Sequence, residues 1–436
     1  MKNGYLFFVW RNLIPLVKCW VRIFTFDVDS NTMKPIRLFT ILVILGIALN
    51  QPCFAQAVSY LKPQKQLLNT IEKNFKTADF QYKFMATKLE PGQFPKSYSD
   101  VAGKLETSNS GWWCSGFYPG VLWYLYEQSN DYSFAKEANR AMVALEKEQY
   151  NTHTHDLGFM MYTSFGNANR LMRNPEYEAV LVNSAKSLAT RFNPKVGCIK
   201  SWDSKPSDFL VIIDNMMNLK LLFWAAKHTG DSSFYRIAVT HANTTMKNHY
   251  RPDYSSYHVV NYNPETGAVQ QKKTAQGYSN ESAWARGQAW GLYGFTMMYR
   301  ETKDKKYLDQ AEHIAHFLIS NPNLPADKVP YWDFNAPNIP NALRDASAGA
   351  IMASALLELC RYADKKDAEK YFKTAQTILE TLSSPAYMAE PGTNGGFILK
   401  HSVGNLPGKS ELDVALTYAD YYFVEAMKRY RNFAAK

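Results

Sequence analysis

The stretch LVIIDNMMNLKLLFWAA, residues 210–226, decides the fold because it is apolar on nearly every face. A helix at the surface of a protein has one apolar stripe, whereas a helix that is apolar all round is buried. The stretch therefore predicts an inner helix that other helices surround. It also contains a carboxylate, Asp214. Because burying an unpaired carboxylate is costly, Asp214 is expected to be paired, to cap a helix or to serve in chemistry.

A repeated turn separates the predicted helices. Asp131, Asn174, Asp231 and Asp304 are each followed three residues later by an aromatic residue, and a looser copy lies at 364–375. An Asp or Asn in this place can cap the next helix, whose aromatic residue then packs inward. With one helix before the first turn and one after the last, the chain accommodates about six helical hairpins.

Six hairpins can form an open superhelix or close into a barrel of two layers. Closure is favoured, because inner helices such as 210–226 are apolar all round. We therefore predict an all-α fold, an (α/α)6 barrel. One small β-hairpin is expected at 257–273, where two alternating runs flank Asn-Pro-Glu-Thr-Gly. The short turns mark one end of the barrel, so the long connections and the unusual residues should gather at the other end.

The N-terminal part has the pattern of a secretory signal at residues 33–55. Two basic residues precede a short apolar run, and Cys-Phe-Ala follows, which predicts cleavage after Ala55. Residues 1–32 are then an upstream extension, and 56–436 form a single barrel domain. The protein is expected to be exported, to the periplasm. The alternative is a membrane anchor built from Tyr-Leu-Phe-Phe-Val-Trp and the later apolar run.

Charge and cysteine content exclude several classes of protein. The whole chain has 49 Lys and Arg against 39 Asp and Glu, and residues 56–436 keep 43 against 37. This mild excess suits an acidic substrate and is too small for a nucleic-acid-binding protein. The three cysteines of residues 56–436, Cys114, Cys198 and Cys360, have no paired spacing, which argues against a disulfide framework. No cofactor is expected, and no motif predicts a metal site.

Unusual residues stand before or at the start of the predicted inner helices. Carboxylates, a histidine, tryptophans and an arginine come together there from distant parts of the chain, which suggests a carbohydrate site with aromatic platforms and proton-handling acids. The segments are GWWCSGFYPG (111–120), THDLGF (154–159), IIDNMMN (212–218), QGYSNESAWARGQAW (276–290), ALRDASAGA (342–350) and HSVGNLPGKSELD (401–413).

Each candidate also has a structural interpretation. Asp156 alone would be a helix N-cap, and Asp345 could form a local ion pair with Arg344 that orients the helix. A lone histidine such as His258 is more often structural than functional. The other candidates could be core or solvated residues, namely Trp113, Trp290 and Arg286. The case for a site rests on their clustering at one end of the barrel.

The motifs together resemble family 88 of the glycoside hydrolases, the unsaturated glucuronyl hydrolases. The resemblance runs in order from about residue 70 to the C-terminus, and its longest block is 276–290. The family has an (α/α)6 barrel, in agreement with the hairpin repeat. The matching motifs are WxxGFxxG (113–120), HDLGF (155–159), DNMMNLxLLxWA (214–225), QGYSxxSxWARGQAW (276–290), RDASAGAI (344–351) and YADYYFxEA (418–426).

The resemblance implies hydrolysis of an unsaturated sugar. Lyases leave a C4=C5 double bond on the non-reducing uronic acid of acidic glycans, and this family removes that sugar by hydrating its vinyl ether. By position, Asp214 matches the acid/base carboxylate and Asp156 the second catalytic aspartate. The residues that match substrate-contacting residues of the family are His258, Gln276, Arg286 and Trp290, and Trp113 is expected to contact the substrate as well. The expected partner is an unsaturated uronic-acid oligosaccharide, with no nucleic acid and no stable membrane association after signal cleavage.

One segment departs from the family. Some members have Ser-x-x-Ser-x-Lys near the C-terminus for a sulfated aglycone, whereas this chain has HSVGNLPGKSELD, in which Ser402, Asn405 and Lys409 could meet a sulfate. Chondroitin, heparin, hyaluronan, gellan-type and ulvan-derived oligosaccharides therefore all stay open as substrates. The alternatives are an unsaturated rhamnogalacturonyl hydrolase, a sugar epimerase, and a non-catalytic glycan-binding protein of the cell surface.

Overall fold

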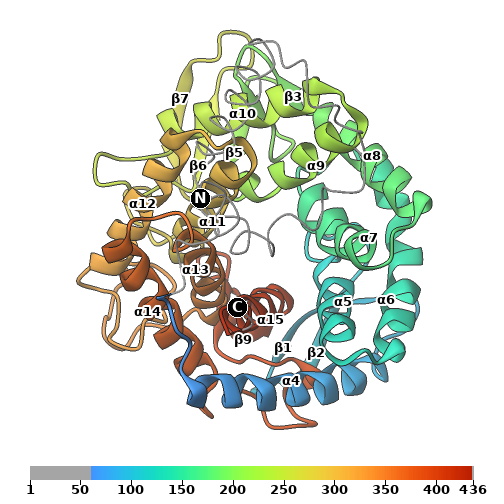
Figure 1. The fold of residues 1–436 in the computed structure, drawn as a ribbon. Coiled ribbons are helices and arrows are strands. Elements are labelled where there is room, and N and C mark those ends of the chain that lie inside the picture. The colour runs from blue at the N-terminus through green and yellow to red at the C-terminus, as the bar shows by residue number, and fades with distance from the viewer. Residues whose placement is uncertain (1–59, 435–436) are drawn as a thin grey trace, which may run out of the picture. The chain divides into compact units, whose positions relative to one another are not determined.

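Six pairs of helices form two concentric rings in the computed structural model, which describes residues 60–434 (Figure 1). The predicted extension and signal, 1–32 and 33–55, lie outside the described residues. Neighbouring inner helices contact one another around the circle, and α15 contacts α5, which closes the ring. The inner ring consists of α5 (Phe117–Ser129), the π-helix η2 (Gly158–Gly166) with α7 (Asn167–Leu171), α9 (Leu219–Thr229), α11 (Ala285–Thr302), α13 (Ala346–Leu359) and α15 (Thr417–Arg431).

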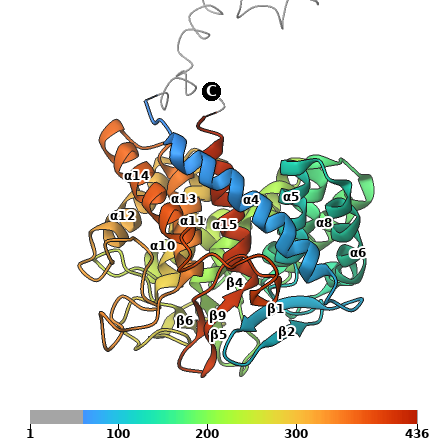
Figure 2. The ribbon, with the colours of Figure 1, turned by 90° about the horizontal axis from the view of Figure 1, so that it is seen from below.

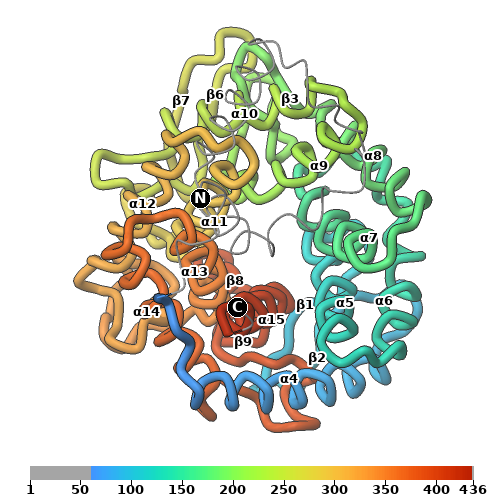
Figure 3. The backbone as a smooth tube through the Cα atoms, in the orientation of Figure 1, coloured from blue at the N-terminus to red at the C-terminus, as the bar shows by residue number. Residues whose placement is uncertain are grey.

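The outer ring covers the inner one. Its first helix along the chain, α4, packs against α15 and α5, so the two ends of the described chain form the sixth helical pair (Figure 3). The inner helix α13 is buried at every residue, as expected for a helix without a polar face. The outer helices are α4 (Lys65–Ala86), α6 (Tyr132–Leu145), α8 (Pro175–Ala189), α10 (Ser232–Asn248), α12 (Lys305–Ser320) and α14 (Lys365–Leu382).

The repeated turns are helix caps, as predicted. The side chain of each capping residue accepts a hydrogen bond from a backbone N–H in the first turn of the outer helix that follows. The aromatic residues of three of these turns, Phe134, Phe234 and Tyr307, are buried. The capping residues are Asp131, Asn174, Asp231, Asp304 and Asp364.

The prediction of one inner helix at 210–226 is wrong in its first half. Residues Phe209–Ile212 form strand β5, Ile213–Met217 form the 3-10 turn η3, and α9 begins only at Leu219. The β-branched run suits a strand, and β5 pairs antiparallel with β6. Asp214 therefore lies in a tight turn between a strand and an inner helix.

The predicted hairpin at 257–273 is confirmed, and further strands accompany it. Strands β6 (Val259–Tyr262) and β7 (Val269–Lys273) pair antiparallel. The sequence prediction missed a four-stranded sheet that joins both ends of the described chain in the order β2-β1-β9-β8. Its strands, with the short pair β3-β4, are β1 (Phe94–Ser99), β2 (Lys104–Ser108), β8 (Ser402–Asn405), β9 (Ser410–Leu416), β3 (Phe192–Asn193) and β4 (Cys198–Ile199).

The two ends of the barrel differ in what they display. Strands gather at the lower end in Figure 2, in the connections that lead from an outer helix to the next inner helix. The short capped turns lie at the other end, after the inner helices.

Cys114, Cys198 and Cys360 are buried free thiols. Between residues 60 and 434, no helix is long and apolar enough to span a bilayer.

Candidate active site

A cavity of about 400 Å³ is formed by the connections and by the starts of inner helices. Five of the residues predicted to be catalytic or to contact substrate line it, and they come from four of the segments quoted above. Two are the predicted catalytic carboxylates, and the others are aromatic, amide and cationic. They are Trp113, Asp156, Asp214, Gln276 and Arg286.

Asp214 is held almost out of solvent in the turn between β5 and α9. Its residue is only 8% exposed, and the preceding N–H, of Ile213, donates to the carbonyl of His258 at 3.0 Å. Burial raises the pKa of Asp214, the charge of Arg286 lowers it and the charge of Asp156 raises it, and together they place it at about 7. Near neutral pH this carboxyl can therefore hold a proton and release it.

His258 lies behind Asp214 as a neutral donor. Its Nδ1 accepts hydrogen bonds from the N–H groups of Ala275 and Gln276, each at 3.2 Å. The ring proton is therefore on Nε2, which lies 3.8 Å from Asp214 Oδ2. Burial lowers the pKa of His258 to about 3, so the imidazole is uncharged. His258 does not line the cavity, and it reaches the site through Asp214.

Asp156 is the second carboxyl of the cavity. The helix η2 begins two residues after Asp156, and its own N-cap residue makes no side-chain capping hydrogen bond. Asp156 is therefore not the helix N-cap that one interpretation of the sequence suggested. Asn218 Nδ2 and Thr154 Oγ1 donate to its two oxygens, each at 3.4 Å. Burial raises the pKa of Asp156 to about 7, against the lowering effect of these two donors. Two carboxyls with raised pKa thus face one cavity.

Arg286 orders one wall of the cavity. The side chain is 1% exposed, donates to the carbonyls of Val403 and Gly404, and pairs with Asp345 at 3.1 Å. Its guanidinium carbon lies 4.4 Å from the centre of the Trp284 ring. The planar fork of arginine suits this set of partners, which a lysine could not match.

The structure does not show the ion pair between Asp345 and Arg344 that was one interpretation of Asp345. Asp345 Oδ1 accepts from the N–H of Ser347 at 3.0 Å and caps α13, while its other oxygen binds Arg286. Arg344 pairs with Asp327 instead. A residue that starts a helix points its side chain back at that helix, which turns Asp345 away from its neighbour.

Two predicted substrate-binding residues lie behind the cavity wall. Trp290 is fully buried and packs against the rings of Phe159 and Tyr422, with centroids 5.1 and 5.2 Å away. Ser402 is also fully buried, and its Oγ accepts from the N–H of Ser347 at 3.2 Å. Trp290 on α11 and Ser402 on β8 thus pack in the protein interior and support the cavity wall from behind. Of the polar residues near Ser402, Asn405 lines the cavity and Lys409 does not.

The sequence prediction missed cavity residues that the sheet β2-β1-β9-β8 supplies. Lys96 in β1 lies 3.3 Å from Glu411 in β9, and its ammonium lies 4.8 Å from the Trp112 ring. Tyr418 and Trp202 line the cavity as well. Glu411 belongs to the segment 401–413 quoted from the sequence, but only the pairing of distant strands shows which side chains of that segment reach the site.

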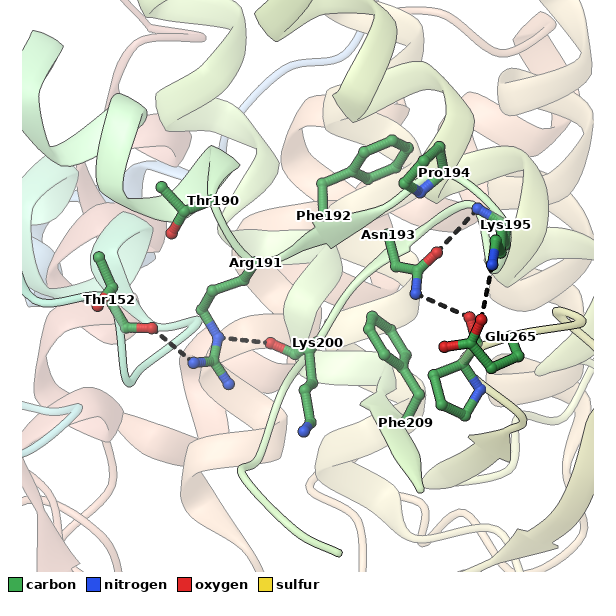
Figure 4. Close-up of a pocket in the computed structure, with 11 residues that line it drawn as sticks. Thr152, Thr190, Arg191, Phe192, Asn193, Pro194, Lys195, Lys200, Phe209 and Glu265 are labelled. Atoms are coloured by element: carbon green, nitrogen blue, oxygen red, sulfur yellow. Dashed lines mark hydrogen bonds and ion pairs between the residues drawn. The ribbon is translucent and has the colours of Figure 1, made fainter. Parts of the chain in front are cut away.

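A larger depression, of about 580 Å³, has no comparable chemistry (Figure 4). Arg191 donates there to the carbonyls of Thr152 and Lys200, at 2.7 and 2.8 Å. Lys195 and Glu265 pair with each other at 2.7 Å. Because the polar groups of this larger depression are already hydrogen-bonded or paired with one another, we assign the candidate active site to the smaller cavity.

Comparison with known proteins gives a consistent result. The model of Glycosyl Hydrolase Family 88 matches residues 87–434. The unsaturated glucuronyl hydrolase of Formosa agariphila is 44% identical over 92% of this chain and 100% of its own length.

Solved structures agree in fold. An unsaturated glucuronyl hydrolase specific for heparin has a TM-score of 0.82 and 51% identity, over 84% of this chain and 98% of its own. A mutant unsaturated glucuronyl hydrolase from Streptococcus agalactiae, complexed with dGlcA-GalNAc6S, has a TM-score of 0.71 and 28% identity, over 82% and 90%. Residues 87–434, which the family model matches, contain the whole cavity wall described above. The chain thus belongs to glycoside hydrolase family 88 and is a glycosidase with an (α/α)6 barrel.

Proposed function

We propose that this glycosidase removes a 4,5-unsaturated uronic acid from the non-reducing end of lyase-generated acidic oligosaccharides by hydrating the C4=C5 double bond. One observation carries the proposal: Asp156 and Asp214, both with a pKa raised to about 7, line the same cavity beside a buried cation, Arg286. The names of the relatives, unsaturated glucuronyl hydrolase among them, support the same substrate class.

The reaction begins with a proton transfer from Asp214. In its acid form, Asp214 protonates C4 of the vinyl ether, and the positive charge spreads over C5 and the ring oxygen. A group with a pKa near the working pH is the best general acid, and such groups contribute about 10²–10⁴-fold. The Nε2–H of His258 faces the carboxylate that the transfer leaves behind.

Asp156 serves the second half of the reaction. In its ionised form it accepts a proton from water as the water oxygen adds to C5. The resulting hemiketal opens to a ketone at C5, and the hemiacetal at C1 then collapses and releases the aglycone alcohol. One proton enters at C4 and one water is consumed, so the sum is a hydrolysis. Near neutral pH the two carboxyls hold one proton between them, as the two roles require.

The cavity wall provides charge and shape for an anionic sugar. Arg286 is a buried cation whose charge acts on Asp214, and its hydrogen bonds to Val403 and Gly404 fix the strand β8 that borders the cavity. Trp113 offers an aromatic face next to Asp156 and Asp214, as sugar-binding sites commonly do. Gln276, which donates to the carbonyl of Gly404 at 3.2 Å, ties the same strand to the His258 hairpin.

The test uses lyase-made disaccharides from several acidic polysaccharides, sulfated and unsulfated. The ultraviolet absorbance of the conjugated enol carboxylate should fall as the aglycone is released, and saturated disaccharides should stay intact. Turnover only of an unsaturated galacturonyl-rhamnose would instead make the protein an unsaturated rhamnogalacturonyl hydrolase. Binding without any loss of absorbance would point to a glycan-binding protein and overturn the proposal.

We further propose that the enzyme is exported to the periplasm. The support is the charged, apolar and small-residue pattern of residues 33–55. Expression of the full chain in a related bacterium, followed by fractionation and N-terminal sequencing, should give a periplasmic protein that begins at Gln56. A cytoplasmic protein with an intact N-terminus would contradict export.

A further inference from the structure

A second cavity, of about 370 Å³, lies within the wall of the barrel and shares no residue with the first. It is bordered by neighbouring inner helices, α5, η2 with α7, α9 and α15. The ring of Phe117 separates the two cavities, since its centroid lies 5.7 Å from that of Trp113 and 5.3 Å from that of Tyr421. The residues around the second cavity include Tyr124, Tyr162, Asn167, Asn169, Arg170, Arg173, Lys220, Trp224 and Tyr421.

Lys220 is the unusual member of this wall. Among residues 60–434 no carboxylate lies within 4.0 Å of its ammonium, and none accepts a hydrogen bond from it. The contact that the ammonium does make is with the face of the Tyr162 ring, 4.9 Å from the centroid. Lys220 is half-buried and has no ion-pair partner in the described part of the chain, so an anion bound in the cavity would stabilise its charge.

The acidic residues nearest to Lys220 are already engaged. Glu358 pairs with Arg300 at 2.6 Å and with Arg429 at 2.8 Å. Glu425 pairs with Arg429 at 3.4 Å and accepts hydrogen bonds from Tyr124, Tyr293 and Ser354. Each oxygen of these two carboxylates therefore already has a partner, and the carboxylates act on Lys220 only through their charge.

Burial disfavours the charged form of Lys220. Burial and the charges of Arg300 and Arg429 lower the pKa of Lys220, the charges of Glu425 and Glu358 raise it, and the result is a pKa of about 8. An anion in the cavity would reverse this effect, because a negative charge next to the ammonium stabilises its protonated form. Two exposed arginines lie at the edge of the cavity: Arg170 is paired with Glu127 at 2.6 Å, whereas Arg173 has no ion pair among the described residues and adds positive potential along the approach.

The rest of the wall indicates what such an anion would be attached to. Tyr162 and Trp224 present aromatic rings beside Lys220, and Asn169 adds an amide. Aromatic faces with a few polar groups are the usual wall of a site for a ring-shaped ligand, and the volume falls in the range of about 300–1,000 Å³ of small-molecule sites.

We propose that this cavity is a second, non-catalytic site for an acidic saccharide, whose carboxylate or sulfate pairs with Lys220 while its ring lies against Tyr162 and Trp224. The proposal does not depend on the function proposed for the first cavity. It concerns saturated sugars as much as unsaturated ones, since nothing in this wall acts on a double bond.

Calorimetric titration with glucuronate, which is saturated and not consumed, tests the proposal. The full enzyme should bind glucuronate at two sites, and Lys220→Met should lose one of them, with at least a tenfold drop in affinity because a charged hydrogen bond is removed. Lys220→Arg, which keeps the charge, should retain both sites. Neutral glucose should not fill the second site.

Turnover and structure provide the controls. In Lys220→Met, kcat/KM for an unsaturated disaccharide should stay unchanged and the melting temperature should not fall. Crystals of the full enzyme soaked in glucuronate should show the sugar carboxylate at Lys220. Identical titrations of the full enzyme and Lys220→Met would overturn the proposal, and so would binding of inorganic sulfate at Lys220 with no competition by glucuronate. Either result would leave the hydrolase activity untouched.

Discussion

The Nε2 atom of His258 lies 3.8 Å from Oδ2 of Asp214, with the ring proton directed at that carboxyl. This distance exceeds a hydrogen bond, so the oxygen is free to hold a proton of its own. The imidazole is neutral, because burial lowers its pKa to about 3. The pair therefore places an uncharged donor next to an acid that ionises near neutral pH.

The rate should depend on the protonation of Asp214. Since its pKa is about 7 in the folded protein, kcat should fall as the pH rises through that value. The charge of Asp156 helps to keep this pKa high, so the alkaline limb of the Asp156→Asn variant should move to lower pH, on top of a reduced rate. A pH–rate profile of both proteins checks this. An unchanged limb in Asp156→Asn would contradict the electrostatic link between the two carboxyls.

Folding stability should respond to pH in a matching way. An unfolded aspartate titrates near 3.8, whereas folded Asp214 titrates near 7, so the folded state binds the extra proton between these values. Stability should therefore be lost as the pH rises from about 4 to 7. Asp214→Asn should be more stable than the parent at pH 8, by a few kcal/mol, and about equally stable at pH 4. Urea denaturation of both proteins at pH 4 and pH 8 measures these differences. If Asp214→Asn were less stable than the parent at pH 8, the raised pKa of Asp214 would be contradicted.

The sequence predicted the barrel because its signals are local. Each capping Asp or Asn and each aromatic residue three positions later belong to one turn, such as Asp131 with Phe134, and helical periodicity is visible in one segment at a time. The catalytic candidates also sit next to these helices. Asp214 could be placed at the start of an inner helix even though the strand β5 before it was mistaken for helix.

The rest of the site depends on contacts between distant segments. Lys96 meets Glu411 only because β1 pairs with β9 across most of the chain. Trp290 and Ser402 belong to motifs of the site, but the direction of a side chain on α11 or β8 is set by packing. The sequence could not show that both are fully buried behind the residues that line the cavity.

Arg286→Lys should damage both folding and catalysis. Lysine cannot reproduce the bonds to Val403, Gly404 and Asp345 together, so one buried carbonyl or the carboxylate of Asp345 loses its partner. Leaving a buried polar group without its hydrogen-bond partner costs about 1–3 kcal/mol. Denaturation curves measure this loss, and Lys306→Arg on the outer surface is the matched control. Full stability of Arg286→Lys would show that the guanidinium network is not needed to order β8.

Gly116→Ala should displace the segment that bears Asp156. A Cβ atom at Gly116 would lie 2.1 Å from the carbonyl oxygen of Met160 in η2, where nothing flexible can give way. Gly349→Ala in the inner helix α13 is the control, because its Cβ would meet only ordinary contacts at 3.5 Å. We expect Gly116→Ala, but not Gly349→Ala, to lose a few kcal/mol of folding stability and to have a lower kcat. Thermal melts and rates that are equal for the two variants would contradict the close approach of α5 and η2.

The central claim is that Asp214 donates the proton that starts hydration of the double bond. A single-turnover experiment with excess enzyme and a lyase-made disaccharide, followed by ultraviolet absorbance, tests it most directly. The parent enzyme and the exposed control Asp304→Asn should lose the enol-carboxylate absorbance together with release of the aglycone. Asp214→Asn should bind the disaccharide and retain the absorbance, with a rate lower by at least about 10²-fold. Loss of absorbance at the parent rate in Asp214→Asn would contradict the account.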